Sequence, residues 1–309
     1  MQKGIKFRIY PNREQQNLIN QTLGCCRFIY NKGLAMRNEA YENGNKIGYS
    51  QTSSMLTELK KCEDFAFLKV VDSIALQQSL RDLDRGFVNF FQKRAAHPTF
   101  KSKHNRHQSY RTVNQGDNIR IVGNYIKLPK LGYVKIRLSM EVGKINNVTI
   151  EHTTTGRYFA VLNVEFKPQP RPNNGGRIGI DVGIKEFYSD SNGNVVSNPK
   201  FLEQSMRKLI REQRRLSRKQ KGSNNRNKQR VKVALVHEKI TNQRNDFLQK
   251  QSTMPHDIAI IRILGFRSLI DNLSNYLISL ADDAHCAKFS ISKYHFLPIR
   301  HRGADRYTL

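Results

Sequence analysis

The sequence predicts an α+β protein with several domains, and three observations support this prediction. Across the first hundred residues, apolar side chains recur every three or four positions, which is typical of amphipathic helices. A series of short strand-like runs separated by turn residues follows, as in a small β-barrel. Beyond a segment rich in proline and glycine, another strand-rich region begins. A chain of 309 residues is long enough for two or three domains.

The N-terminal region is predicted to be one strand followed by helices. Residues 3–10 alternate in polarity, and helical periodicity extends over 14–43, 50–61 and 72–95. The last helix has an apolar face suited to a core. Its polar face carries Gln77, Gln78, Arg81, Arg85, Asn89 and Lys93. Since glutamine can pair with adenine and arginine with guanine, this face either contacts DNA or is simply solvated.

The predicted barrel strands and the basic loop before them occupy the middle of the chain. The loop 96–108 holds three histidines, His97, His104 and His107. No carboxylate or cysteine accompanies them, so a phosphate-facing loop is favoured over a metal site. The strands are predicted at 108–113, 118–122, 125–128, 133–138, 145–151 and 157–166. The segment 168–176 then forms a linker.

Charge points to a polyanionic partner. The chain has 53 Lys and Arg against 25 Asp and Glu, a net charge of +28 that is spread along its length. Nucleic acid is the favoured partner, with a merely basic protein as the alternative. No apolar run is long enough to span a membrane, no signal peptide is visible, and the four cysteines form no CxxC pair. We expect a cytoplasmic protein.

The segment 205–250 is helical in pattern and strongly basic. Between Arg207 and Lys232 the only acid is Glu212, and a Gly222-Ser-Asn-Asn turn divides the segment into a helical hairpin. A charge run of this kind is usually a solvated face. Because compensating acids are lacking, a track for a nucleic-acid backbone is favoured here.

Asp181 is the candidate metal ligand of the chain. It lies in Arg177-Ile-Gly-Ile-Asp-Val-Gly, which is predicted to be a strand with the aspartate in its middle among apolar neighbours. The Asn192-Gly193 turn that follows marks a hairpin. A carboxylate inside such a strand usually serves metal chemistry, because burying it unpaired is costly. The arrangement resembles the start of RNase H-like nucleases, which hold two Mg²⁺ ions.

An ordered set of motifs resembles the TnpB proteins, which are transposon-encoded RNA-guided nucleases. The motifs are Lys6-Phe-Arg-Ile-Tyr-Pro-Asn, Gly24-Cys-Cys-Arg-Phe-Ile-Tyr-Asn-Lys, Leu76-Gln-Gln-Ser-Leu, Phe100-Lys-Ser-Lys, Ile126-Lys-Leu-Pro-Lys-Leu-Gly, Gly179-Ile-Asp-Val-Gly-Ile-Lys-Glu-Phe and His237-Glu-Lys-Ile-Thr-Asn-Gln-Arg-Asn-Asp-Phe. The resemblance covers about residues 1–254.

The resemblance implies an architecture and partners. Residues 1–10 and 111–170 would form a wedge-type β-barrel, and 11–110 a helical recognition lobe. Residues 175–309 would form a truncated RuvC-like RNase H domain with the basic hairpin 205–250. The implied partners are a guide RNA and double-stranded DNA with a short flanking motif, bound by a monomeric ribonucleoprotein without a membrane. Base pairing would read the sequence, and the protein would read the motif. The resemblance further implies a nucleoid-associated protein of a bacterium.

The resemblance also assigns candidate contact residues. By position, the residues implied to read the flanking DNA motif are Tyr49, Ser73, Gln77, Gln78 and Thr112. A structural role inside the helix pair is the alternative for Gln77 and Gln78. The residues expected to contact the nucleic-acid backbone are Lys6, Arg8, Arg27, Arg207, Arg211, Arg214, Arg215 and Arg218.

The sequence departs from the family pattern at the expected metal site. The strand matching the one with the second carboxylate is Ile258-Ala-Ile-Ile-Arg-Ile, with Ile261 and Arg262 in place of the acidic pair. The zinc ribbon and the third carboxylate of the family are not found before Leu309. A two-metal mechanism needs several carboxylates. We therefore expect a protein that is not an enzyme, with a vestigial Asp181 and no required metal or cofactor, although residual Mg²⁺ at Asp181 stays open.

The leading hypothesis is an RNA-guided DNA-binding protein that represses transcription by occupying a promoter, like the TnpB-like nuclease-dead repressors. Two alternatives stay open. One is an RNA-guided endonuclease with a rebuilt site that uses Asp181, Asp257 or Asp305. The other is a decayed transposon remnant.

Overall fold

The computed structural model describes residues 2–105, 108–166, 176–253 and 258–264. The chain divides into two compact units. The first unit comprises Met1–Arg171 together with Phe201–Met254, and the second comprises Pro172–Lys200 together with Pro255–Leu309.

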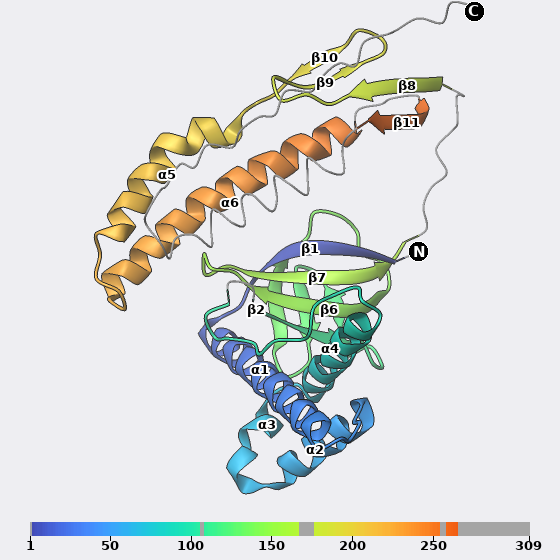
Figure 1. Cartoon of the computed structure of the whole chain (residues 1–309), viewed down its shortest axis with the longest axis vertical. Coiled ribbons are helices and arrows are strands. Elements are labelled where there is room, and N and C mark those ends of the chain that lie inside the picture. Colours follow the sequence, from blue (N-terminus) through green and yellow to red (C-terminus); the bar gives the residue numbers. More distant parts are fainter. Residues whose placement is uncertain (1, 106–107, 167–175, 254–257, 265–309) are drawn as a thin grey trace, which may run out of the picture. The chain divides into compact units, whose positions relative to one another are not determined.

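A curled sheet of seven strands forms the centre of the first unit (Figure 1). Its order is β2-β6-β7-β1-β5-β4-β3, and all of its pairs are antiparallel. The strands are β1 (Gln2–Tyr10), β2 (Gln108–Val113), β3 (Arg120–Val122), β4 (Tyr125–Leu128), β5 (Gly132–Arg137), β6 (Ile145–His152) and β7 (Tyr158–Glu165). The predicted strands are thus confirmed, with ends that differ by one or two residues.

The alternation of polarity along these strands explains why the sheet curls around a core. In β7 the side chains alternate between buried and half-buried, so one face of the strand points inward. The inward residues of the sheet join those of the first helices in one cluster, which includes Phe7, Ile150, Leu162, Ile19 and Leu76. The barrel and the helices therefore fold as one body.

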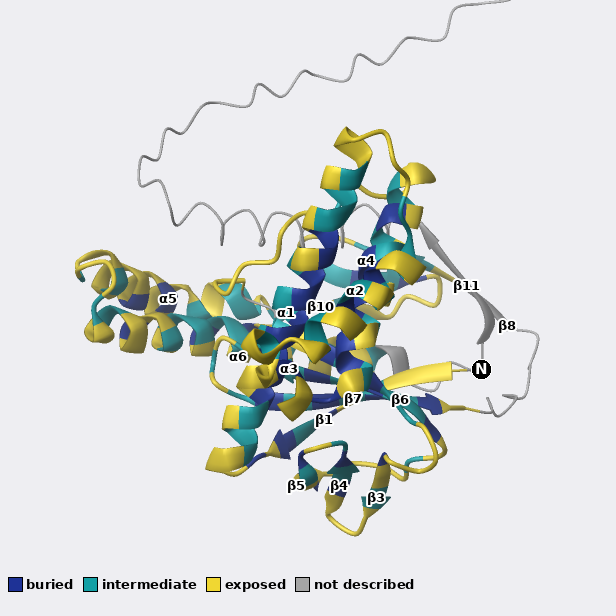
Figure 2. Ribbon diagram, turned by 90° about the horizontal axis from the view of Figure 1, so that it is seen from below, coloured by how far each residue is buried: buried dark blue, intermediate teal, exposed yellow. Residues whose placement is uncertain are grey.

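The helices of the first unit follow β1 and pack on one end of the curled sheet (Figure 1). They are α1 (Arg13–Glu42), α2 (Tyr49–Lys61), η1 (Glu63–Phe65), α3 (Phe67–Val70) and α4 (Ser73–Phe91). Burial runs along α1 and α4 where the two helices face each other (Figure 2). The short η1 and α3 were not predicted, because three or four residues are too few to show a period.

Local chemistry fixes where the two long helices begin. Asn12 and Gln15 form a capping box at the start of α1. The Gln15 amide also donates to the backbone oxygens of Leu131 at 3.1 Å and Tyr133 at 2.9 Å, which ties α1 to β5. Asp72 caps α4, since its carboxylate accepts from the amide of Ile74 at 2.9 Å.

A close approach of α1 and α4 requires glycine at position 33. A Cβ atom built on Gly33 would lie 2.9 Å from Leu80 Cδ2 and 3.1 Å from Leu83 Cδ2. By contrast, a Cβ on Gly24 of the same helix meets only Arg27 Nη2, at 4.0 Å. The two glycines therefore have different roles, although both lie inside α1.

The helices α5 (Phe201–Ser217) and α6 (Asn224–Thr253) form the predicted helical hairpin. Their contact buries Leu209 of α5 against Val236 and Ile240 of α6. Between the helices, Gly222 takes a φ of +84°, a conformation that glycine adopts without strain. Most other positions of α5 are exposed (Figure 2).

The second unit contains a four-stranded sheet in the order β10-β9-β8-β11. Its strands are β8 (Gly176–Asp181), β9 (Glu186–Asp190), β10 (Val195–Ser197) and β11 (Ile258–Leu264). The predicted Asn-Gly hairpin joins β9 and β10, and the Asp190 carboxylate accepts from two amides of that turn, each at 2.9 Å. β11 runs parallel to β8, with Leu264 in register with Asp181.

Candidate nucleic-acid interface

An exposed polar face on α4 carries three residues at helical spacing, Ser73, Gln77 and Arg81. Residues four apart lie on the same side of a helix, so the three side chains form one row. Two of them are contacted by α2. Lys60 Nζ donates to Ser73 Oγ at 2.9 Å, and Tyr49 Oη accepts from Arg81 Nε at 3.3 Å. The Arg81 guanidinium also lies 5.2 Å from the centroid of the Tyr49 ring.

This face has unbalanced positive charge because the acids of α4 are already paired. Asp84 accepts from Arg37 Nη1 at 2.9 Å, and Asp82 forms a short ion pair with Arg111. Burial lowers the pKa of Lys60, while the charge of Asp72 acts in the opposite direction. Arg81 was predicted on this helix face, as either a DNA contact or a solvated residue. Lys60 was not among the predicted contact residues, since only the packing of α2 on α4 brings it to the row.

The remaining two residues predicted to read DNA lie in different surroundings. Gln78 is half-buried beside the row. Thr112 is 1% exposed, and its hydroxyl donates to Asp72 Oδ2 at 2.5 Å. Its side chain is therefore occupied inside the unit, where it supports the residue that caps α4.

Three residues predicted to contact the nucleic-acid backbone, Lys6, Arg8 and Arg27, interact with neighbouring side chains. Lys6 Nζ donates to Glu151 Oε2 at 2.5 Å and lies 4.7 Å from the Phe159 ring centroid. The Arg8 guanidinium lies 5.1 Å from the ring centroid of Tyr10. Arg27 donates to Gln108 Oε1 at 3.3 Å, so this arginine is partly engaged.

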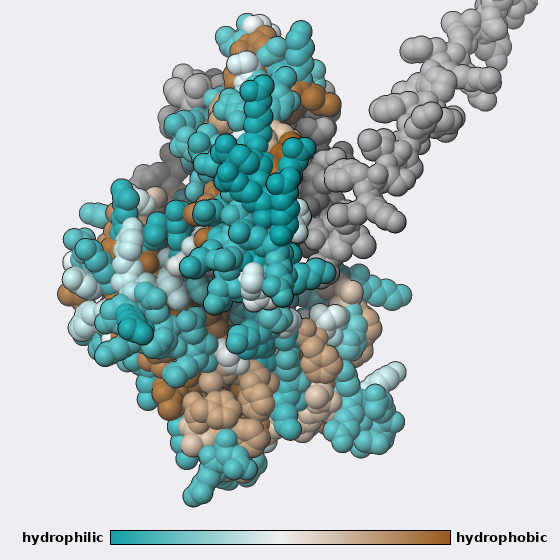
Figure 3. Space-filling model, turned by 90° about the vertical axis from the view of Figure 1, so that its left-hand side faces the viewer, coloured by the Kyte–Doolittle hydropathy of each residue, from teal (hydrophilic) through white to brown (hydrophobic). Residues whose placement is uncertain are grey.

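All five arginines predicted here are exposed: Arg207, Arg211, Arg214 and Arg215 of α5, and Arg218 directly after it. The space-filling view shows strongly hydrophilic side chains over much of one side, with hydrophobic ones gathered toward its lower end (Figure 3). Guanidinium groups match phosphate in a bidentate way. The helix is therefore chemically suited to a phosphodiester backbone.

One acid of this basic hairpin is buried, and its significance was missed from sequence. Glu212 is 6% exposed and accepts from Gln229 Nε2 of α6 at 2.7 Å. That hydrogen bond, with weaker contributions from Arg215, Arg211 and Lys232, lowers the pKa of Glu212 against the effect of burial. Its isolation within the run 207–232 was the signal that could have revealed it.

The histidines of the basic loop show no metal-binding arrangement in the described part of the chain. His97 packs edge-on against the rings of Phe87 and Phe90, with centroids 5.3 and 5.2 Å apart. His104 is exposed, and His107 lies outside the described residues. Asn31 fixes the loop through two hydrogen bonds to the backbone of Lys101, at 2.8 and 3.0 Å.

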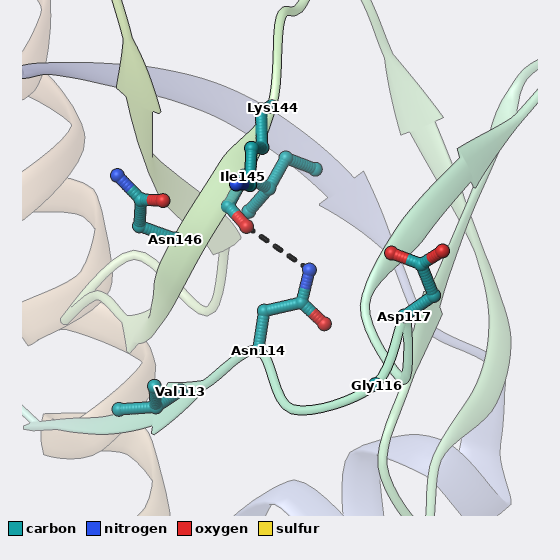
Figure 4. A pocket seen from close by; sticks show the side chains of 7 residues that line it. All are labelled: Val113, Asn114, Gly116, Asp117, Lys144, Ile145 and Asn146. Carbon is teal, nitrogen blue, oxygen red and sulfur yellow. Dashed lines mark hydrogen bonds between the residues drawn. The ribbon is translucent and has the colours of Figure 1, made fainter.

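A shallow cavity of 570 Å³ opens where the turn after β2 meets the start of β6 (Figure 4). Lys144 and Asp117 bring opposite charges to its wall. The Asn114 amide donates to the oxygens of Ile145 at 3.0 Å and Ile119 at 3.1 Å. Asn114 thereby joins the two turns of the curled sheet, which is a structural role.

Asp181 lies elsewhere than predicted. It is the last residue of β8 and is exposed, whereas the sequence placed it mid-strand among apolar neighbours. The strand ends there because the chain turns tightly: a Cβ on Gly183 would come within 3.1 Å of the Glu186 carbonyl. A carboxylate at a strand end is accessible to an ion without the cost of burial.

The structure describes some of the other residues of the predicted metal site and leaves out the rest. For Ile261 and Arg262 the structure gives the backbone of β11, opposite Ile178 and Gly179. Asp257 and Asp305 lie outside the described residues. Among the residues that are described, no three histidine, cysteine or acidic side chains gather closely enough to hold a metal ion. No helix in those ranges is both long and apolar enough to cross a membrane.

Two family models match parts of the chain. Residues 148–255 match a family described as probable transposase, and residues 1–46 match its helix-turn-helix domain. A "Putative RNA-guided DNA endonuclease" of Streptomyces pristinaespiralis is 38% identical over 280 residues, covering 88% of this chain and 69% of the relative. The "Putative RNA-guided DNA endonuclease InsQ" of Escherichia coli K12 is 37% identical over 253 residues, covering 81% and 62%. The chain thus spans less than two thirds of the second relative.

A solved structure shares the fold. The cryo-EM structure of a Cas12f1–sgRNA–target DNA complex aligns with a TM-score of 0.50 at 11% identity, over 87% of this chain and 82% of that chain. The predicted mixture of helices with a curled sheet is confirmed at this level.

The expectation that the chain is not an enzyme is wrong. The two relatives are named as RNA-guided DNA endonucleases, which are enzymes, and nothing in the described residues shows a degenerate site. The expectation rested on Ile261 and Arg262 in place of the acidic pair and on the zinc ribbon and third carboxylate that are not found before Leu309, and neither observation outweighs the enzymes among the relatives. With 38% identity across more than two thirds of the Streptomyces relative, this chain belongs to the TnpB family of RNA-guided DNA endonucleases.

Proposed function

We propose that this chain binds a guide RNA and, through it, double-stranded DNA that carries a short flanking motif. The observation that supports this most is the exposed arginine row of α5, in a chain with a net charge of +28. The names of its relatives and the nucleic-acid complex of its structural neighbour agree with this proposal. The guide RNA is the partner on which binding depends, and the ribonucleoprotein contains one protein chain.

The face of α4 is the proposed reader of the flanking motif. Ser73, Gln77 and Tyr49 lie there, and Arg81 adds a guanidinium that the Tyr49 ring supports. Gln78 lies at its margin. An arginine can bond two acceptors of guanine, and a glutamine two groups of adenine. A matched pair of variants, Gln77→Ala and Arg81→Ala, should therefore shift the preferred motif at different positions.

The proposed backbone contacts are the arginines of α5, Arg218 directly after it, and Lys6, Arg8 and Arg27. Each phosphate contact contributes roughly 0.7 to 0.9 to the slope of log affinity against log salt. Replacing one arginine should thus weaken binding about equally for all sequences and lower the slope by about one unit. A sequence-specific loss at α5 would contradict this assignment.

We also propose DNA cleavage, because the two relatives are named as RNA-guided DNA endonucleases. Asp181 is the residue whose replacement tests this activity. The second unit is the proposed RuvC-like domain, because Asp181 ends β8 beside the parallel strand β11. Mg²⁺ at such a site would stabilise the attacking and leaving oxygens. Among the described residues no group of three acidic, histidine or cysteine side chains is close enough to hold a metal ion, so no cleavage step is derived from them.

Repression of transcription is a second candidate, since occupation of a promoter blocks transcription by itself. The placement of the binding residues favours it: the α4 face and the α5 row lie in the first unit, whereas Asp181 lies in the second. Binding and cutting are therefore separable by mutation. The repressor subtype stays a prediction.

One experiment tests binding and cutting together. The protein is purified with its RNA, the RNA is sequenced, and DNA matching the guide is added with Mg²⁺ beside a mismatched control. Binding of matched DNA alone supports the proposal. Cutting that Asp181→Ala abolishes supports the nuclease assignment, whereas equal binding of matched and mismatched DNA would refute RNA guidance.

A further inference from the structure

The basic hairpin buries one carboxylate, and its contacts suggest a specific purpose. The Glu212 side chain is 8% exposed, and the stretch from Arg207 to Lys232 contains no other acid. Burying a carboxylate is costly unless it is paired and hydrogen-bonded. The partners of its two oxygens therefore indicate what the acid does.

One side of Glu212 joins the two helices. Gln229 Nε2, on α6, donates to the backbone oxygen of Glu212 at 3.1 Å and to its Oε2 at 2.7 Å. Gln229 is itself 5% exposed, so this link lies inside the hairpin. It is a structural contact and leaves Oε1 for other partners.

The other oxygen forms ion pairs with two arginines at the surface, and one of them, Arg215, is also hydrogen-bonded to it. Glu212 Oε1 lies 3.1 Å from Arg215 Nη1 and 3.6 Å from Arg211 Nε. The two arginine side chains are 57% and 62% exposed. A guanidinium has five N–H donors, so each arginine keeps free donors after this contact. The acid is buried, while the groups that it orients are accessible.

We infer that Glu212 is a positioning residue that presents Arg211 and Arg215 to a phosphodiester backbone. A free arginine samples many rotamers, and ordering it on binding weakens the complex. A carboxylate that already holds two guanidinium groups removes part of this cost. The inference rests on the proposed function, because it names how one basic surface meets its nucleic acid.

The inference makes a prediction opposite to simple electrostatics. A negative charge beside a phosphate repels it, so on charge alone the removal of Glu212 should strengthen binding. If Glu212 positions the arginines, its removal should weaken binding. The sign of the change therefore separates the two explanations.

Two variants separate positioning from the structural link. Glu212→Gln keeps one oxygen to accept from Gln229 but offers an amide in place of the second carboxylate oxygen. Gln229→Met removes the link between the helices and leaves the carboxylate for the arginines. Glu203→Gln, at an exposed position in the first turn of α5, is the control for losing one acid from the same helix.

The experiment measures binding of the full chain to a guide-free single-stranded RNA and to a duplex DNA over a range of salt. For Glu212→Gln we expect binding roughly five- to tenfold weaker near 0.1 M salt and a slope lower by about one unit, the equivalent of one phosphate contact. Gln229→Met should lower the melting temperature and leave the slope unchanged. Glu203→Gln should bind equally well or slightly better.

A variant cycle keeps the test decisive if Glu212→Gln disturbs folding. In an Arg211→Gln, Arg215→Gln background, the additional Glu212→Gln change should leave the salt slope unaltered. If Glu212→Gln binds more weakly to only one of the two nucleic acids, the result supports the inference and identifies which backbone the arginines contact. Equal or tighter binding by Glu212→Gln overturns the inference while the proposed function stands. If the wild-type chain binds neither nucleic acid, both fail.

Discussion

The buried pair of Thr112 and Asp72 should contribute to stability rather than to DNA reading. The two residues are 1% and 7% exposed, and the hydroxyl donates to Asp72 Oδ2 at 2.5 Å. Thr112→Val removes this hydrogen bond at nearly constant volume. A hydrogen bond to a charged group contributes about 1.5–3 kcal/mol, so we expect a loss of roughly 2 kcal/mol in the free energy of unfolding.

Denaturant and thermal unfolding followed by circular dichroism measure this loss. For a folded body of this size, roughly 2–4 °C of melting temperature corresponds to 1 kcal/mol, which gives a decrease of about 4–8 °C. The matched control is Thr22→Val. Thr22 is 3% exposed, but its hydroxyl donates to the Leu18 oxygen of its own helix at 2.8 Å. Removing that neutral hydrogen bond should lower the free energy of unfolding by about 1 kcal/mol or less.

A different pattern would refute the reasoning. If Thr112→Val unfolds like the wild type and yet changes the preferred flanking motif, Thr112 reads DNA as its position in the sequence suggested. The burial of Thr112 would then not prevent it from contacting DNA.

Three further predictions concern helices of the first unit. Gly33→Ala should destabilise the fold by about 1–3 kcal/mol because its Cβ meets Leu80, whereas Gly24→Ala should stabilise it by up to about 1 kcal/mol. Equal effects of the two variants in chemical unfolding would contradict close packing at Gly33. Glu212 has a lowered pKa, so its contribution should be fully present above its ordinary value of about 4.3 and be lost as pH falls through the lowered pKa. Unfolding measured against pH should therefore show a smaller acid loss in Glu212→Gln, and identical pH profiles would argue against this. Arg81→Lys should keep salt-dependent binding but relax motif preference in a library selection, and an unchanged motif would remove Arg81 from the reader.

The secondary structure was largely predictable because its signals are local. The alternation in β6 and β7 and the apolar spacing of α1 and α4 each cover two or more repeats. The predicted extension of α4 to residue 95 was too long, since Lys93 takes a φ of +57° and ends the helix. Such an end depends on backbone geometry, for which Lys93 gives no sequence signal.

The candidate site was predictable only in part because its roles depend on packing. Sequence position suggested that Thr112 faces DNA, but the fold places it against Asp72 in the core. Periodicity placed Arg81 on the polar face of its helix, but the support of Arg81 by Tyr49 and the presence of Lys60 beside Ser73 depend on the contact of α2 with α4, which a periodic pattern does not show. The burial of Glu212 likewise depends on Gln229, seventeen residues farther along the chain.

Sequencing the RNA that co-purifies with this protein from its native host tests the central claim most directly. The proposed function predicts one discrete RNA species that ends in a short guide matching a DNA site of that host. A guide matching a promoter would favour repression, and one matching an empty insertion site would favour cleavage. Recovery of no defined RNA, from a protein that is folded and intact, would contradict RNA-guided DNA binding.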